Sequence, residues 1–315
     1  MGWKTKRNAL LVFMVLVMCT AWTTALAEEN QAYLELQSYG EASYRDTNFD
    51  AANQNRYLGW WENRLVWRYK HTLNDKPLWR HLAFEPYLKA LLALSEKPDI
   101  WWENTFVVGV GLENRFLDGL KVLDNPQWKW AKNIRLYIEF LAVNYVKESA
   151  PDNVKDYDLR IGLGFWKEWN IPPDREVDSK LWGEAWIDLS WRRENFSDIS
   201  NDTHYLGLVA RVGFKLNDYK DEKFTKKTKV YYLPYAVLDT GYTGNDFFWE
   251  NRINIGAGFR VMPVIGLSEK DNRKNIVFRI FAEYLHTVDH WQGDPSPGTP
   301  DHDFRIGVNF SYNLY

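Results

Sequence analysis

The chain ends in the stretch Phe304-Arg-Ile-Gly-Val-Asn-Phe-Ser-Tyr-Asn-Leu-Tyr315, in which apolar and polar residues alternate without a break as far as Leu314. One face of this stretch is apolar or aromatic throughout, and the other carries arginine, glycine, asparagine and serine. Successive side chains of a β-strand point to opposite faces, so a period of two predicts a strand. A face that stays apolar over this length must be buried against something.

The beginning of the chain is typical of an export signal. A short basic segment, Lys4 to Arg7, precedes an apolar run from Ala9 to Trp22, and Ala25-Leu-Ala27 matches the small-residue pattern of a cleavage site. We therefore predict a signal peptide over residues 1–27 and a mature chain over residues 28–315.

Cys19 is the one cysteine of the chain, and it lies within the predicted signal peptide. An alternative is that Cys19 is lipidated as in a lipoprotein. Met18 argues against this, because such sites favour a small residue at that position, and the Ala-Leu-Ala site competes with it. Cleavage after Ala27 leaves no cysteine, which excludes disulfides, thiolate metal sites and cysteine nucleophiles from the mature chain.

The composition of the chain favours a membrane protein without membrane-spanning helices. No run of 18 or more apolar residues follows the signal peptide. Aromatic residues make up 17% of the chain and include 17 tryptophans, more than a soluble core usually needs but typical of interface girdles. The net charge is −3 and the basic residues are dispersed among acidic ones, so we expect no nucleic-acid partner.

Alternating segments of about ten residues, separated by turn signals, recur along the mature chain. They predict an all-β fold, a closed antiparallel transmembrane β-barrel of about twelve strands. An even number of strands puts both ends of the mature chain on one side of the membrane, the periplasm. The expected strands are 32–45, 57–70, 82–94, 105–116, 134–147, 157–169, 181–193, 204–216, 229–239, 248–262, 275–288 and 304–315.

A soluble β-sandwich or β-barrel is the alternative, because its strands also have one apolar face. Nearly every predicted strand, however, carries charges on its polar face, often of both signs, and aromatic residues cluster at strand ends. Both features favour the membrane barrel. The connections on the periplasmic side are longer than ordinary hairpin turns. One of them, Asp118 to Lys132, is predicted to hold a short helix, and such long turns are suited to docking a partner.

The charged faces of the strands are predicted to line the lumen. An Arg or Lys that faced lipid at mid-depth would cost roughly 2–4 kcal/mol. Acidic and basic residues neighbour each other, which predicts cross-strand ion pairs and argues against a filter of one sign. The predicted lumen-lining residues are Glu62, Arg64, Arg68, Glu85, Glu113, Arg115, Arg135, Glu139, Arg160, Glu184, Asp188, Arg192, Arg211, Glu250, Arg252, Arg260, Arg279, Glu283 and Arg305.

Aromatic residues share the charged face, among them Tyr39, Trp166 and Trp186. Tyrosine and tryptophan beside charged hydrogen-bonding groups suit a neutral or zwitterionic polar solute, including sugars. The alternative is that these side chains simply plug a narrow barrel.

The tripeptide Trp-Glu-Asn occurs three times, each time near the start of an even-numbered predicted strand. Its tryptophans, Trp61, Trp102 and Trp249, are predicted to be rim aromatics at the lipid–water interface, with the following glutamate pointing inward. The simpler interpretation is an aromatic girdle with polar rim residues. The functional alternative is a ring of ligand contacts at the mouth of the barrel.

An enzyme has to be considered, because the outer-membrane phospholipase also has twelve strands. That chemistry needs a serine, a histidine and an orienting partner within hydrogen-bond reach, and no histidine here lies in a stretch that matches that family. We therefore predict no catalytic residue. Histidines and aspartates of the last outer loop have spacings that suit a divalent metal, but a plain loop is the simpler reading, and we predict no metal and no cofactor. These loop residues are His286, Asp289, His290, Asp301, His302 and Asp303.

The export signal, the strand number, the girdle aromatics and the terminal Tyr315 together resemble the outer-membrane β-barrel proteins of Gram-negative bacteria, over the whole mature chain. One detail departs from that class: its last strand usually has apolar residues in phase with the final aromatic, whereas here they share the phase of Leu314. The register of the last strand is therefore open.

Within that class, the dense Trp and Tyr, the balanced lumen charges and the long inner turns more closely resemble barrels that export exopolysaccharide, such as the barrel domain of the phage N4 adsorption protein, than general trimeric porins. The resemblance implies surroundings of outer-membrane lipid and lipopolysaccharide, passive passage of a polar solute such as a saccharide or exopolysaccharide, and a periplasmic secretion or synthesis partner. The rival hypothesis is a closed barrel that acts as an outer-membrane enzyme of the lipase or deacylase type, or as a scaffold of a secretion complex.

Overall fold

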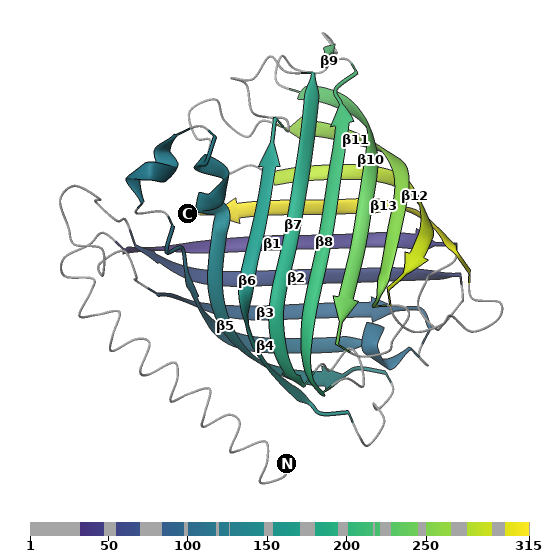
Figure 1. The fold of residues 1–315 in the computed structure, drawn as a ribbon. Helices are drawn as coiled ribbons and strands as arrows, with labels where there is room; N and C mark the ends of the chain where they lie inside the picture. The colour runs from purple at the N-terminus through teal and green to yellow at the C-terminus, as the bar shows by residue number, and fades with distance from the viewer. Residues whose placement is uncertain are drawn as a thin grey trace.

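The structure is a computed structural model, and Figure 1 shows its fold. The predicted signal peptide lies outside the described residues, as do the tripeptide tryptophan Trp249 and the terminal Tyr315. The described residues are 32–46, 55–69, 84–97, 100–117, 120–125, 127–147, 154–170, 180–194, 201–216, 218–220, 228–244, 250–265, 276–291 and 300–314.

The described residues form one antiparallel sheet that closes on itself. Each long strand pairs with the next one along the chain, and β1 pairs with β13 to complete the barrel. The strands are β1 (Ala32–Arg45), β2 (Arg56–Tyr69), β3 (Glu85–Ser95), β4 (Thr105–Asn114), β5 (Ile134–Tyr145), β6 (Tyr157–Trp169), β7 (Leu181–Glu194), β8 (Asn201–Phe214), β9 (Asp218–Lys220), β10 (Thr228–Thr243), β11 (Arg252–Ile265), β12 (Ile276–His290) and β13 (His302–Leu314).

Twelve of these strands build the wall. The thirteenth, β9, is three residues long and pairs only with the beginning of β10, so it extends that hairpin without adding to the circumference. In Figure 1, strands β6, β7 and β8 of one wall cross strands β1 to β4 of the opposite wall, because the strands of a closed barrel are tilted against its axis. We call the end where β1 connects to β2 the outer end, and the end where β2 connects to β3 the inner end.

The predicted strands are confirmed as the twelve wall strands, and those at 32–45 and 157–169 have the predicted bounds. The largest differences lie at one hairpin, where β10 continues to Thr243 and β11 begins only at Arg252. The side chain of Asn251 explains this boundary, because its Oδ1 accepts a hydrogen bond from the backbone N–H of Thr243 at 2.8 Å. This contact holds the end of β10 against the residue that precedes β11.

The outer surface of the wall is apolar. Along β13, Phe304, Ile306 and Val308 all point outward with more than a third of each side chain exposed, while Arg305 points inward. Every wall strand contributes in the same way. These outward side chains include Leu34, Leu65, Leu88, Phe106, Val108, Leu136, Ile138, Ile161, Leu163, Leu189, Val212, Phe214, Leu238, Ile255, Phe259, Phe278 and Ile280.

The inner surface is only partly polar, which the sequence pattern did not predict. One apolar cluster lies inside the barrel around β10, and a smaller one consists of Val107, Leu141 and Val143. Leu141 and Val143 share a face of β5 with the ionised Glu139, so apolar residues fill part of the lumen as well as coating the wall. The β10 cluster is formed by Trp182, Leu233, Tyr235, Val237, Met262 and Leu285.

Two tyrosines inside the barrel lie flat across glycines of the neighbouring strand. Tyr87 on β3 is paired with Gly111 on β4, and Tyr235 on β10 is paired with Gly258 on β11. A Cβ atom at either glycine would overlap the tyrosine ring. Both tyrosines are at least 95% buried, so a shift of either ring would displace its neighbours inside the barrel.

We therefore expect Gly258→Ala to lower the free energy of unfolding by about 1–3 kcal/mol, the usual range for overpacking a filled site. Gly59→Ala is the matched control, because the nearest atom to an added Cβ there lies 3.8 Å away. Urea titration of the two refolded variants, followed by tryptophan fluorescence, measures the difference. Equal stability of the two variants would show that the ring of Tyr235 can yield.

The connection from β4 to β5 at the inner end contains two 3-10 helices, η3 (Lys121–Asp124) and η4 (Lys129–Asn133), and these confirm the short helix predicted in that turn. Figure 1 shows this helical segment beside the beginning of β5. A third 3-10 helix, η2 (Trp101–Glu103), lies at the outer end. None of the described helices has the length and the hydropathy that crossing a membrane would require.

Candidate solute site in the barrel lumen

A cavity of about 750 Å³ lies inside the barrel. Side chains from both walls line it, and five of them are large aromatic residues, Tyr39, Trp60, Trp166, Trp186 and Phe310. Nine of the predicted lumen-lining residues also line this cavity. They are Glu62, Arg64, Arg115, Arg135, Glu184, Arg211, Arg260, Arg279 and Arg305.

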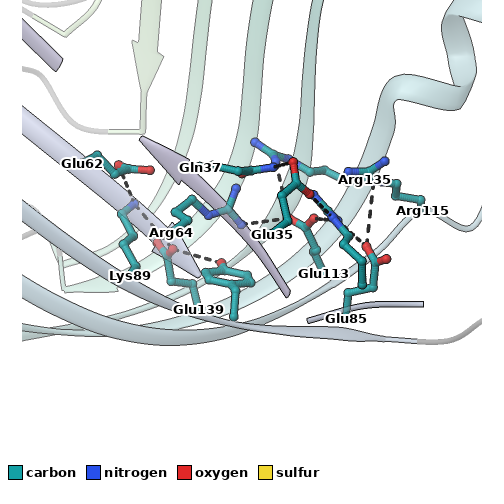
Figure 2. Close-up of polar contacts among 12 residues, drawn as sticks. Glu35, Gln37, Glu62, Arg64, Glu85, Lys89, Glu113, Arg115, Arg135 and Glu139 are labelled. Atoms are coloured by element: carbon teal, nitrogen blue, oxygen red, sulfur yellow. Dashed lines mark hydrogen bonds and ion pairs between the residues drawn. The ribbon is translucent and has the colours of Figure 1, made fainter. Parts of the chain in front are cut away.

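The first ion-pair network is centred on Arg68 of β2, and Figure 2 labels its partners Glu35, Glu85 and Glu113. Its guanidinium contacts three carboxylates from three strands: Glu35 at 2.5 Å, Glu113 at 2.5 Å, and Glu85. Glu113 is fully buried and also accepts a hydrogen bond from Arg64 at 2.8 Å. Strands β1 to β4 are thus joined through their inward faces as well as through their backbone ladders.

The same network continues toward Lys89 of β3. The Lys89 ammonium lies 3.2 Å from Glu62 and 3.5 Å from Glu139. The hydroxyl of Tyr87 donates to Glu139 at 3.0 Å, and the guanidinium of Arg64 lies 4.1 Å above the Tyr87 ring. The tyrosine that covers a glycine is therefore held by an arginine on its face and a carboxylate at its hydroxyl.

The opposite wall repeats this arrangement around Tyr235. Its hydroxyl donates to Glu283 at 3.1 Å, and the guanidinium of Arg260 lies 5.0 Å from its ring centre. Arg211 joins Glu283 at 2.9 Å to Glu184 at 2.8 Å, and Arg260 also binds Glu184 at 2.8 Å. The two networks have the same chemistry on two walls: buried carboxylates, each held by one or more guanidinium groups.

A third group of polar contacts lies on β5 to β8. Tyr137 donates to Asp188 at 2.6 Å, and Arg192 contacts the same carboxylate at 3.1 Å. The guanidinium of Arg192 also lies 3.6 Å from the ring centre of Tyr205. Arg160 pairs at 2.5 Å with an aspartate two residues before it on the same strand. These contacts cover the inward faces of the strands between the two larger networks.

Two contacts cross the lumen between strands that are not neighbours in the sheet. Glu168 on β6 accepts a hydrogen bond from Arg279 on β12 at 2.8 Å. Tyr39 on β1 and Trp166 on β6 meet edge to face, with ring centres 5.8 Å apart. The lumen is therefore narrowed where β6 faces β1 and β12, and its size there depends on side chains.

The remaining predicted lumen residues take different places. Arg68, Glu85, Glu113, Glu139, Arg160, Asp188, Arg192 and Glu283 lie in the ion-pair networks. Glu250 directly precedes the last residue before β11, and Arg252 begins that strand at the outer end. Sequence reasoning did not select Glu168, Lys132 or Asn133, which also line the cavity. The alternation of β6 places Glu168, two residues after Trp166, on the inward face and could have identified it. Lys132 and Asn133 lie in a connection without a periodic pattern, so no face could be assigned to them.

The Trp-Glu-Asn repeats are not structurally equivalent. Trp61 lies within β2, points outward and donates from Nε1 to the Ser38 hydroxyl at 2.7 Å. Trp102 belongs to η2, beside the loop that precedes β4. The asparagines of the second and third repeats have the same role. Asn104 accepts a hydrogen bond from the Ser95 N–H at 3.0 Å, and Asn251 accepts one from a backbone N–H in its own loop.

The histidines and aspartates of the last outer loop do not share one face. His302 lies 3.1 Å from Asp301, and His286 lies 3.8 Å from it, on the outside of the wall. Asp303 instead contacts Arg305 at 2.5 Å inside the barrel. The hydrogen bond with His302 lowers the pKa of Asp301 below its ordinary value. Among the described residues, no group of three or more His, Cys, Asp and Glu side chains is placed to hold a metal ion.

Comparison with known proteins gives similarity at the level of the fold only. No protein-family model matches the sequence, and no curated protein matches it. The β domain of the Bordetella autotransporter BrkA aligns over 89% of this chain and 98% of its own, at 9% identity and a TM-score of 0.36. An outer-membrane channel from Pseudomonas putida F1 aligns over 90% and 95%, at 12% identity and a TM-score of 0.34. A bacterial polysaccharide outer-membrane secretin aligns over 90% and 98%, at 10% identity and a TM-score of 0.37.

The wall itself determines where the barrel resides. Large apolar side chains are exposed on every wall strand and so surround the barrel, whereas the largest contiguous apolar patch of a soluble monomer is roughly a few hundred Å². A closed barrel with an apolar exterior and ionised groups inside is built for the outer membrane, since closure pairs the strand backbones with no open edge. The chain is an outer-membrane β-barrel. The lumen of this outer-membrane β-barrel is its candidate functional site.

Proposed function

We propose that this outer-membrane β-barrel is a channel for the passive passage of a polar solute, and that the solute is a saccharide. The central cavity carries the proposal. It holds about 750 Å³ in the interior, is lined from both walls, and combines aromatic faces with ionised groups. A barrel that served only as a scaffold would have no need of a cavity with this lining.

The lining chemistry supports a hydroxylated solute. Tyr39, Trp60, Trp166 and Trp186 offer flat apolar faces to a sugar ring, while carboxylates and guanidinium groups beside them offer acceptors and donors to its hydroxyls. Binding sites of this kind combine aromatic walls with a few polar groups that fix orientation. Passage also requires that no single site bind too tightly, which several modest contacts along the lumen provide.

Export of a longer saccharide is the narrower form of the proposal. It rests on the resemblance to exopolysaccharide-exporting barrels and on the inner end, where a partner for synthesis or secretion would dock. There η4 and the residue before it expose Trp128 and Trp130, at 52% and 44% of their full surface. Trp130 also packs against Phe165, which lies on the outer surface of the barrel, with ring centres 6.1 Å apart. This segment therefore lies close to the lipid.

Single-channel conductance of the refolded mature protein in a planar bilayer tests the proposal. We expect discrete current steps that decrease when oligosaccharides are added, because a sugar in the lumen displaces the ions that carry the current. Heat-modifiable gel migration of the same sample confirms that the barrel is folded. A silent bilayer from folded protein would contradict the channel and favour the closed barrel of an enzyme or scaffold.

A further inference from the structure

We infer that the inner half of the lumen holds a subsite for an anionic group, formed by Arg115 and Arg135, and that the saccharide it takes is an acidic one bearing carboxylates. The inference rests on the proposed function and narrows its substrate class. It comes from the way in which the first ion-pair network distributes its charges.

The network as a whole is balanced, but its two ends differ in sign. Glu62 and Glu139 share Lys89 at one end, whereas Arg115 and Arg135 lie at the other end (Figure 2). Around Arg68, four guanidinium groups face three carboxylates, so that one guanidinium is in excess. The four arginines are Arg64, Arg68, Arg115 and Arg135, and the three carboxylates are Glu35, Glu85 and Glu113.

The carboxylates of this end are already taken by other arginines. Glu113 is held by Arg64 at 2.8 Å and by Arg68 at 2.5 Å, and Arg135 reaches it only at 3.4 Å. Arg115 lies 3.9 Å from Glu85, which is bound by Arg68. Both peripheral arginines therefore keep donor capacity, since each guanidinium carries five N–H groups.

The same two side chains face the cavity. The side chain of Arg115 is 43% exposed and that of Arg135 is 29% exposed, compared with 3% for Arg68. Both belong to the lining of the central cavity. Among the arginines and lysines of the lumen whose ion pairs are described above, these two have the most exposed side chains and therefore the most surface for contact with a solute.

Arg135 is positioned by the strand beside it. It is paired with Gly164 of β6, and a Cβ atom at that glycine would lie 3.0 Å from the Arg135 Nε. The side chain therefore lies across β6 at the point where no other side chain intervenes. Two residues further along the same face is Trp166, which meets Tyr39 across the lumen. The Arg135 guanidinium thus stands next to an aromatic wall, and Arg115 lies at the same end of the network (Figure 2).

This juxtaposition matches an acidic sugar. Guanidinium groups bind carboxylates through charge-assisted hydrogen bonds, often as a fork with two parallel bonds. A uronate residue has its carboxylate on a pyranose ring, and that ring would pack against the indole of Trp166. A neutral sugar would use the same aromatic wall but would leave the arginine donors to water.

Current block by two oligosaccharides of equal length tests the inference. Oligogalacturonate carries a carboxylate on each ring, and a maltooligosaccharide carries none. We expect the acidic oligomer to block the wild-type channel at the lower concentration. In the double variant Arg115→Gln Arg135→Gln we expect this block to weaken roughly tenfold or more, and block by the neutral oligomer to change little.

Lys129→Gln is the matched control. It removes one positive charge from the same inner end, but Lys129 is exposed on η4 and lies outside the cavity lining. We expect it to keep the preference for the acidic oligomer. If the control and the double variant lose the same preference, the general charge of the inner end decides selectivity and the subsite is wrong.

A binding measurement separates this inference from the channel proposal. Quenching of tryptophan fluorescence by oligogalacturonate in the refolded barrel reports occupancy of the site whether or not the barrel conducts. Acidic binding that the double variant loses, in a silent bilayer, would support the subsite and contradict the channel. Conductance with equal block by both oligomers would support the channel and overturn the subsite.

Discussion

Replacing Glu113 with glutamine is expected to lower the free energy of unfolding by about 3–5 kcal/mol, the range for removing one partner from a buried ion pair. Glu113 is fully buried, and its carboxylate contacts Arg64, Arg68 and Arg135. The amide of glutamine keeps the shape of the side chain but turns one acceptor into a donor and removes the charge. Arg68 is then left with the carboxylates of Glu35 and Glu85.

The measurement is urea unfolding of the barrel refolded in lipid vesicles, followed by tryptophan fluorescence. Glu41→Gln is the control, because Glu41 is 3.9 Å from Arg45 and both side chains keep contact with water. A pair of this kind contributes about 1 kcal/mol or less. If the two variants were equally stable, the buried network would not be holding the wall strands together.

The barrel was predictable from the sequence because its rule is local. Each wall strand has an outward position every second residue, and that position must be apolar to meet lipid. Phe304, Ile306 and Val308 therefore determine the orientation of Arg305, which the structure places inside with Asp303. The open register of the last strand is now given by its pairing with β1, in which Ile306 lies opposite Tyr44.

The arrangement of the lumen was not predictable, because it depends on which strands face each other across the barrel. Alternation indicated that Glu184 and Arg211 point inward. It did not indicate that Arg260, three strands away from Glu184 around the wall, also binds Glu184. Alternation also did not indicate that Leu141 and Val143 point inward. An apolar side chain on the inward face can be recognised only when its neighbours inside the barrel are known. Lumen contacts between distant strands leave no periodic trace in the sequence.

Replacing Trp166 with alanine is expected to raise the unit conductance of the channel, roughly doubling it, because current is limited by the narrowest cross-section of a pore. Trp166 reaches across the lumen to Tyr39, and its indole is the bulkier member of that contact. The side chain is 40% exposed to the lumen, so its removal costs little packing. The double variant Glu168→Ala Arg279→Ala removes the second crossing contact without leaving an unpaired charge, and we expect it to act in the same direction.

Trp186→Ala is the matched control for this prediction. Trp186 lines the same cavity and is paired with Trp166 across the β6–β7 ladder. Its ring, however, lies against Gly207 of β8, along the wall and away from the opposite strands. Removing it enlarges the cavity at the side without opening the constriction, so the conductance should change much less than in Trp166→Ala. An equal rise in both variants would place the limiting cross-section elsewhere in the lumen, and the contacts between β6 and the opposite wall would then have no part in setting the pore.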